Sequence, residues 1–241
     1  ISFSPILFWC GFKTEQNKHF LFSTLIEPKD FSIRKNQPTP LERATKLFVM
    51  LEHSLVNLIW EIAFFPSQDY LLFRLSLENK SEQKIFVNEL VPFAYRGADD
   101  GLEMGRGWTA WRFYRLGYQS WSPSGSVSLR TPCKKPRCRL AKKIGQAPYL
   151  WQRNFPEIFS SEWMAEIVEP DQDLAFLLGF ITAKNQLGVI EAEVKYERFR
   201  RLEAIAPCEE IRLKPDEKIS SDWVIAILSD APRASQKKYF E

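Results

Sequence analysis

The feature that most constrains the fold is a succession of short segments rich in β-branched and aromatic residues. Turn-forming residues separate these segments, as in Pro66-Ser67-Gln68-Asp69 and Glu78-Asn79-Lys80-Ser81. Short segments at such spacing are typical of antiparallel sheets. The sequence therefore predicts an all-β fold, a large antiparallel β-sandwich of two sheets. We expect strands at Ser2–Phe12, His19–Ile26, Leu47–Glu52, Leu55–Phe64, Tyr70–Leu77, Lys84–Tyr95, Trp108–Leu116, Trp163–Val168, Leu174–Thr182, Gly188–Val194, Arg198–Ile205, Glu210–Leu213 and Asp222–Leu228.

Alternation within Tyr70–Leu77 indicates which side of a strand meets the core. Arg74 and Ser76 share one parity, whereas Phe73 and Leu75 share the other. Successive side chains of a strand point to opposite faces, so one face of this strand is predicted to be buried and the other solvated. Hairpin turns are expected at residues 169–173 and 183–187.

Three stretches lack the strand pattern. The polar, Pro-rich stretch Glu27–Glu42 is predicted to be a loop, and Ala147–Phe159 is irregular and aromatic. Pro232–Glu241 has Pro at a helix-start position and is predicted to form the first turns of a helix. We expect a further domain after residue 241, because the chain stops inside this helix. The chain is thus divided into a sandwich domain, 1–230, and the start of a linker helix, 231–241.

Composition favours one large globular domain. The chain has 241 residues, 45% of them hydrophobic, and a formal net charge of +3. Only Arg130–Lys143 is locally basic, and no aromatic residue is interleaved there for base stacking, so we expect a solvated loop and no nucleic-acid partner. The longest apolar runs are too short to cross a membrane. We expect no membrane partner and a cytoplasmic rather than secreted protein.

Few residues are suited to metal binding or catalysis. Cys133 and Cys138 have a spacing that a metal site could use, but no second Cys pair or His completes it. A disulfide and two free thiols both remain open for this pair. His19 and His53 have no nucleophile motif nearby, and the neighbours Glu209-Glu210 would point to opposite faces of a strand. The sequence therefore predicts no catalytic residue, no metal site and no cofactor.

The stretch Gly117–Gly125 differs from the strands around it. It combines aromatic rings, a side-chain amide, hydroxyl groups and a Pro/Gly turn. This composition favours an ordered surface loop that presents a ring, and such a loop is suited to recognition. The nearby Trp108 and Trp111 are assigned to packing.

The run Gly117–Pro123, Gly-Tyr-Gln-Ser-Trp-Ser-Pro, resembles the Trp/Tyr-Gln-Ser-Trp segment in the N-terminal β-supersandwich of family 36 glycoside hydrolases, the α-galactosidases and their relatives. Later segments are similar to the second half of that domain in order and spacing. These segments are Ser160–Met164, Leu177–Thr182, Leu213–Glu217 and Ser220–Trp223.

The resemblance implies a sandwich packed against a (β/α)8 barrel that follows residue 241. Two Asp residues of that barrel would act as nucleophile and acid/base in a retaining mechanism, and this chain alone would be inactive. Lys214-Pro215-Asp216 matches the family's Lys-x-Asp nucleophile motif, but it lies in a predicted Pro turn and is not assigned that role.

The resemblance also implies roles within the loop. Trp121 would reach the barrel's active-site mouth and wall the pocket for a galactoside or other glycoside. Tyr118 takes the place of the first Trp and is the second substrate-binding candidate, whereas Gln119 and Ser120 would support the loop. A homo-oligomer is compatible with such a sandwich. The alternative is a stand-alone sandwich that binds carbohydrate or protein without catalysis.

Overall fold

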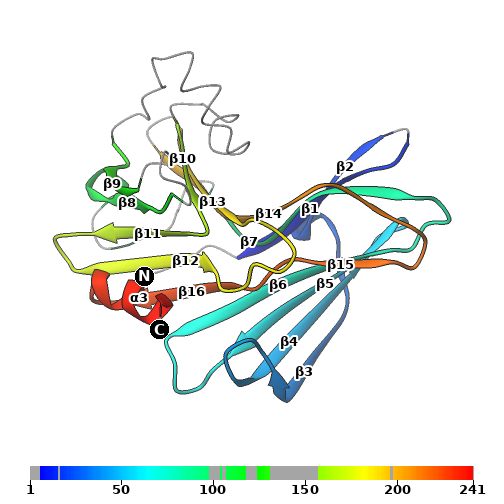
Figure 1. The fold of residues 1–241 in the computed structure, drawn as a ribbon, viewed down its shortest axis with the longest axis horizontal. Coiled ribbons are helices and arrows are strands. Elements are labelled where there is room, and N and C mark those ends of the chain that lie inside the picture. The colour runs from blue at the N-terminus through cyan, green and yellow to red at the C-terminus, as the bar shows by residue number, and fades with distance from the viewer. Residues whose placement is uncertain are drawn as a thin grey trace.

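A computed structural model describes residues 6–15, 17–97, 104, 107–117, 124–130, 157–195 and 198–240. These residues form sixteen strands in two antiparallel sheets, which confirms the predicted all-β sandwich (Figure 1). Among them, no helix is long and apolar enough to span a membrane.

The large sheet has ten strands and the small sheet has six. In spatial order, the large sheet consists of β3 (Pro28–Pro38), β4 (Arg43–Glu52), β5 (Val56–Phe64), β6 (Tyr70–Asn79), β16 (Val224–Ser229), β12 (Leu174–Phe180), β11 (Met164–Glu169), β8 (Arg112–Arg115) and β9 (Gly125–Ser128), with β15 (Lys218–Ser220) also paired to β6. The small sheet consists of β10 (Ile158–Glu162), β13 (Val189–Lys195), β14 (Arg198–Leu213), β7 (Ile85–Arg96), β1 (Leu7–Lys13) and β2 (Lys18–Phe22).

The main core lies between the two sheets. Phe73, Leu75 and Leu77 of β6 are fully buried there, as the alternation predicted. The expectation that the other face of β6 is solvated is wrong, because Ser76 is buried and Leu72 belongs to the apolar cluster on the outer face of the sheet. Burial of one such large apolar side chain stabilises the fold by about 1.5–3 kcal/mol. This periodicity of two fixes which face of each strand points inward.

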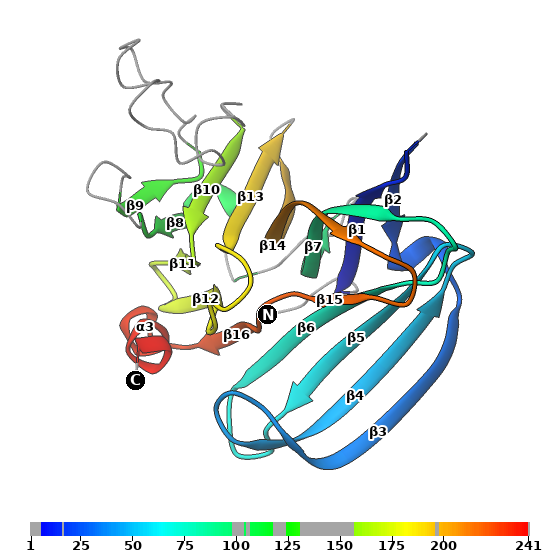
Figure 2. The same cartoon turned by 45° about the vertical axis from the view of Figure 1, so that its right-hand side comes forward.

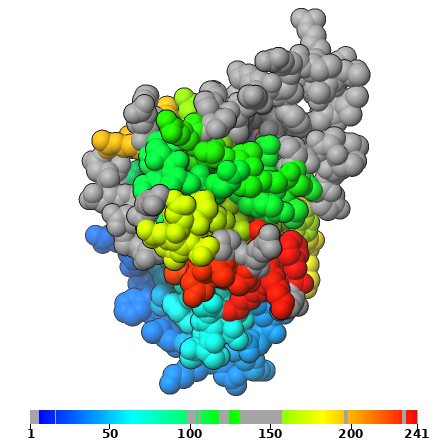
Figure 3. Space-filling view, turned by 90° about the vertical axis from the view of Figure 1, so that its left-hand side faces the viewer, coloured from blue at the N-terminus to red at the C-terminus, as the bar shows by residue number. Residues whose placement is uncertain are grey.

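A second apolar cluster lies on the outer face of the large sheet, where helix α3 (Pro232–Phe240) covers it. Tyr239 packs against this cluster, and its hydroxyl donates to the carbonyl of Phe180 at 2.5 Å. Ser235 and Gln236 donate to the buried carboxylate of Glu166. Figure 3 shows the helix, in red, on the surface between the yellow β11–β12 region and the cyan β5–β6 region. The predicted C-terminal helix is thus confirmed and is packed against β12 and β16.

Several predicted boundaries are wrong. The expected loop Glu27–Glu42 contains the long strand β3, which pairs with β4 and has Pro28 and Pro38 at its ends. Pro cannot donate to a ladder, so it is tolerated at the ends of edge strands. Residues 183–187 connect strands of different sheets instead of forming a hairpin, because β12 belongs to the large sheet and β13 to the small one.

Two further segments differ from expectation. Trp108–Ala110 forms a short 3-10 helix, η2, so that the strand expected from Trp108 begins only at Arg112. The two strands expected at 198–205 and 210–213 are one strand, β14, with register shifts between Ala204 and Ile211. Another 3-10 turn, η1 (Ser23–Leu25), follows β2.

Candidate functional site

The recognition loop expected from the sequence connects β8 and β9, at one end of the large sheet. These two strands pair from Arg112↔Ser128 to Arg115↔Gly125. Beyond the last pair, the Gly117 N–H donates to Ser124 Oγ at 2.9 Å and closes the base of the hairpin. Gly125 has a φ of +129°, a conformation that favours glycine. The connection therefore starts and ends at residues held by hydrogen bonds.

The start of this connection is also bound to the small sheet. The Leu116 N–H donates to Ser161 Oγ at 2.7 Å, and the Leu116 carbonyl accepts from the Glu162 N–H at 3.0 Å. Ser161 and Glu162 end β10, the edge strand of the small sheet, and both are buried. Both sheets thus contribute to the position of the hairpin base.

The predicted site residues Tyr118, Gln119, Ser120 and Trp121 lie outside the described residues, as do Cys133 and Cys138. Their roles stay predictions. The packing roles of the two neighbouring tryptophans are confirmed. Trp111 is 1% exposed and its ring lies 5.5 Å from that of Phe199, while Trp108 packs partly buried against the same core.

The segment Ser220–Trp223 has a structural role that sequence reasoning missed. The Asp222 carboxylate accepts hydrogen bonds from Thr182 Oγ1 at 2.7 Å and from the N–H groups of Lys184, Asn185 and Gln186 at 3.1, 2.9 and 2.9 Å. Burial alone would raise its pKa, but these hydrogen bonds to the ionised form prevail and lower it. Asp222 therefore holds the segment that crosses from the large sheet toward the small one.

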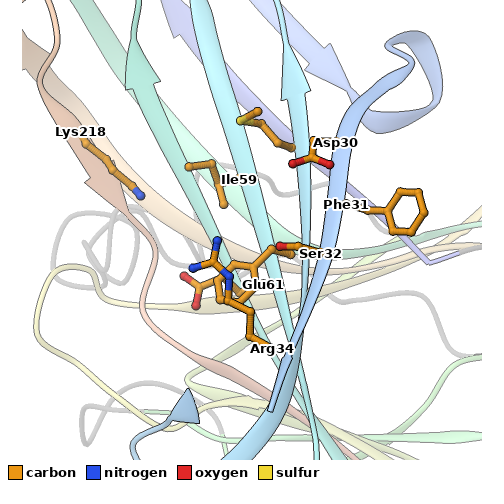
Figure 4. A pocket seen from close by; sticks show the side chains of 9 residues that line it. Asp30, Phe31, Ser32, Arg34, Ile59, Glu61 and Lys218 are labelled. Atoms are coloured by element: carbon orange, nitrogen blue, oxygen red, sulfur yellow. The ribbon is translucent and has the colours of Figure 1, made fainter. Parts of the chain in front are cut away.

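A shallow groove of about 250 Å³ lies on the outer face of the large sheet, between β3, β4, β5 and β15. Its apolar lining includes Phe48, Met50 and Ile59. In Figure 4, Asp30, Ser32 and Arg34 lie on the groove side of β3, and the ring of Phe31 points to the other side. The Arg34 guanidinium lies 4.9 Å from the centre of the Phe48 ring.

One carboxylate of this groove, that of Glu61, is buried and paired with cations. Glu61 is 8% exposed and bound by Lys46 Nζ at 3.0 Å, with Arg74 Nη1 at 3.8 Å from its other oxygen. A buried carboxylate that is paired with cations is typical of a structural ion-pair network.

The outer face of the small sheet holds a network of buried charges. Glu203 is 0% exposed and accepts from Trp9 Nε1 at 3.1 Å, Arg96 Nε at 2.8 Å and Arg201 Nη1 at 2.7 Å. Arg201 also binds Glu191 and Glu193. Burial would lower the pKa of Arg201, but these carboxylates raise it further above its usual value. The acidic groups are engaged by cations, as expected for a structural network.

The other residues that were considered for catalysis, two histidines and Asp216, make packing, hydrogen-bond or ion-pair contacts. His19 of β2 stacks on Phe12 of β1. His53 Nδ1 accepts from the Leu55 N–H in a turn, and burial lowers the pKa of His53. Asp216 is exposed in a turn and pairs with Lys80 at 3.3 Å. Among the described residues, no group of three or more His, Cys, Asp or Glu is placed to hold a metal ion.

Comparison with known proteins gives a match in structure only. No protein-family model and no curated protein matches the chain. The galactosidase domain of the α-galactosidase-sucrose kinase AgaSK is similar with a TM-score of 0.67 and 11% identity, over 96% of this chain and 31% of that one. The GH36 α-galactosidase AgaA from Geobacillus stearothermophilus, solved in complex with stachyose, has a TM-score of 0.61 and 10% identity over 96% and 31%.

An α-galactosidase from Lactobacillus brevis is similar to the same degree, with a TM-score of 0.61 and 10% identity over 95% of this chain and 30% of that one. The chain thus spans less than a third of the length of the solved structures it matches. In architecture, the chain is therefore similar to one domain of the family 36 α-galactosidases, the family that residues 117–123 resemble in sequence.

Proposed function

We propose that this chain is the N-terminal, non-catalytic domain of an α-galactosidase-like retaining glycoside hydrolase. The observation that carries the proposal is the shared fold, which covers 96% of this chain but 31% of the galactosidase domain of AgaSK. In a protein of that length, the part that this chain does not match is long enough to contain a catalytic barrel.

In this proposal, Trp121 walls the sugar pocket of that barrel. A galactose ring has an apolar C–H face, and an indole offers a flat apolar surface with one N–H donor. The hairpin base, closed by Gly117 and Ser124 and bound to Ser161, supports the role because a wall must keep its position relative to the barrel. Tyr118 lies beside the pocket, and Gln119 and Ser120 hold the loop.

The catalytic carboxyl groups belong to the barrel. In a retaining enzyme they lie about 5–5.5 Å apart, one as nucleophile and one as acid/base. The contribution of this chain is to bind and orient the sugar, so its loss lowers substrate binding and transition-state stabilisation without removing the chemistry.

The test is hydrolysis of a chromogenic α-galactoside by the full-length protein and its Trp121→Ala variant. We expect kcat/KM to fall about five- to thirtyfold, since loss of one aromatic stacking contact removes on the order of 1–2 kcal/mol. Phe20→Ala is the matched control, because Phe20 is an exposed ring in β2, away from the β8–β9 hairpin, and should leave kcat/KM unchanged.

Two results would count against the proposal. Unchanged kinetics in Trp121→Ala, with the same unfolding temperature as the parent, would refute the pocket role. A natural coding sequence with no barrel after residue 241 would refute the domain assignment and favour a stand-alone binding sandwich.

A further inference from the structure

β3 leaves one edge of the large sheet open. Within the described part of the chain, this strand pairs only with β4, and Figures 1 and 2 both show it as the outermost strand, away from the small sheet. Its unpaired backbone N–H and C=O groups form a template for another strand. An edge of eleven residues is long for a protein that must avoid unwanted pairing.

The inner side of this edge is apolar and uncovered. Phe31 is 72% exposed and Ile33 is 67% exposed. They lie directly opposite Val49 and Leu47 of β4, on the face that elsewhere packs into the core. The apolar face of the large sheet therefore extends beyond the part that the small sheet covers.

Features that protect edge strands are confined to the ends of β3. Pro28 and Lys29 lie at one end, and at the other a register shift follows Arg34, with Asn36 at a φ of +56°. Prolines, lysines and bulges are the usual means of blocking an edge. The central residues 30–34, Asp-Phe-Ser-Ile-Arg, contain none of them.

This central segment is complementary to itself in antiparallel orientation. A two-fold axis through Ser32 places Asp30 opposite Arg34 of the partner subunit and Phe31 opposite the partner's Ile33. Directly opposite residues have Cβ atoms about 4.5–5.5 Å apart, within reach of an ion pair and an apolar contact. Neither Asp30 nor Arg34 makes an ion pair within the described chain, so both are available.

We propose that two copies of this chain associate through antiparallel pairing of β3 with the β3 of a second copy, centred on Ser32. The pairing joins two large sheets into one continuous sheet and covers Phe31 and Ile33 in both copies. It is isologous, so each cross-strand pair occurs twice. Lys29 faces Lys35 of the partner subunit in this register, and its charge is balanced by an ion pair with Glu52. An interface of one strand is small, so association depends on concentration.

Sedimentation velocity of the 241-residue chain over a range of concentrations tests the proposal. We expect a concentration-dependent rise from 28.2 kDa to twice that mass. Asp30→Arg and Arg34→Asp each place two pairs of like charges in the interface and should weaken association about tenfold or more. Glu82→Arg and Lys18→Asp, two exposed sites away from β3, make the same changes in net charge and should not weaken it.

Two charge-swap experiments make the test specific to the proposed register. The double variant Asp30→Arg/Arg34→Asp restores both opposite-charge pairs and should again form dimers. An equimolar mixture of the two single variants should form a mixed dimer, because the arginine introduced into one chain then faces the aspartate introduced into the other. A purely monomeric parent chain, or dimers that neither single variant weakens, would overturn the proposal. So would a double variant and a mixture that both stay monomeric.

Discussion

Substitution of Gly179 by Ala tests how α3 is held on the sandwich. A Cβ at position 179 would lie 2.6 Å from Tyr239 Cε2, 3.0 Å from Tyr239 Cζ and 2.9 Å from Met164 Cβ. Met164 Cβ is attached to the backbone of the neighbouring strand β11 and cannot move away. Tyr239 must therefore leave its place, and the hydroxyl contact with the Phe180 carbonyl is lost.

The expected magnitude follows from these contacts. One methyl group inserted into a packed site costs about 1–3 kcal/mol, and a lost hydrogen bond adds about 1 kcal/mol. Together we expect Gly179→Ala to lower the free energy of unfolding by about 2–4 kcal/mol. Urea unfolding followed by tryptophan fluorescence measures this difference. Trypsin cleavage after Lys237 and Lys238, which should become faster, reports release of the helix.

Gly107→Ala is the matched control. A Cβ at Gly107 meets nothing within 4 Å and the backbone φ is −58°, so Ala should be neutral or stabilise by up to about 1 kcal/mol. The double variant Gly179→Ala/Tyr239→Ala should lose less stability than the two single variants in sum, because the clash disappears with the ring. Equal stability of Gly179→Ala and Gly107→Ala would refute the packing of Tyr239 over Gly179.

Two further predictions concern buried carboxylates. Asp222→Ala should destabilise the chain by about 2–4 kcal/mol at pH 7, because several donors lose a charged acceptor. Because the pKa of Asp222 is lowered in the folded state, its ionised carboxylate stabilises the fold fully above the usual Asp pKa of 3.8. This stabilisation is lost as pH falls below that value, so the unfolding temperatures of parent and variant should converge at low pH. Burial raises the pKa of Glu166 above 4.5, although Ser235 and Gln236 oppose this. The folded state thus binds this proton more tightly than the unfolded state, so the free energy of unfolding of the parent should fall as pH rises above 4.5. Glu166→Gln has no such proton and should lack this fall. The same pH dependence in both proteins would contradict the prediction.

The strand pattern was predictable wherever alternation or a dense apolar run was present. The strand expected at Tyr70–Leu77 corresponds to β6, and the one at Leu55–Phe64 corresponds to β5, each within two residues at either end. Such strands can be predicted from their local sequence, because the face that meets the core must be apolar. Helix α3 was predictable from Pro232 at its first position.

Polar strands and connections between sheets were not predictable in this way. β3 lacks a buried face, because the small sheet does not extend over it, so its sequence resembles that of a loop. Residues 183–187 cross between the sheets, and their backbone N–H groups donate hydrogen bonds to Asp222, which lies far along the chain.

By itself, the sequence determined the class of fold, the face of each alternating strand that is buried, and the segment at 117–123 that resembles family 36 glycoside hydrolases. These depend on local periodicity and local motifs. Only the tertiary structure decided the order of strands in each sheet, the packing of Tyr239 over Gly179 and the open edge at β3. The base of the hairpin that carries Trp121 belongs to this second group, because Leu116 and Ser161 are brought together only when the two sheets pack.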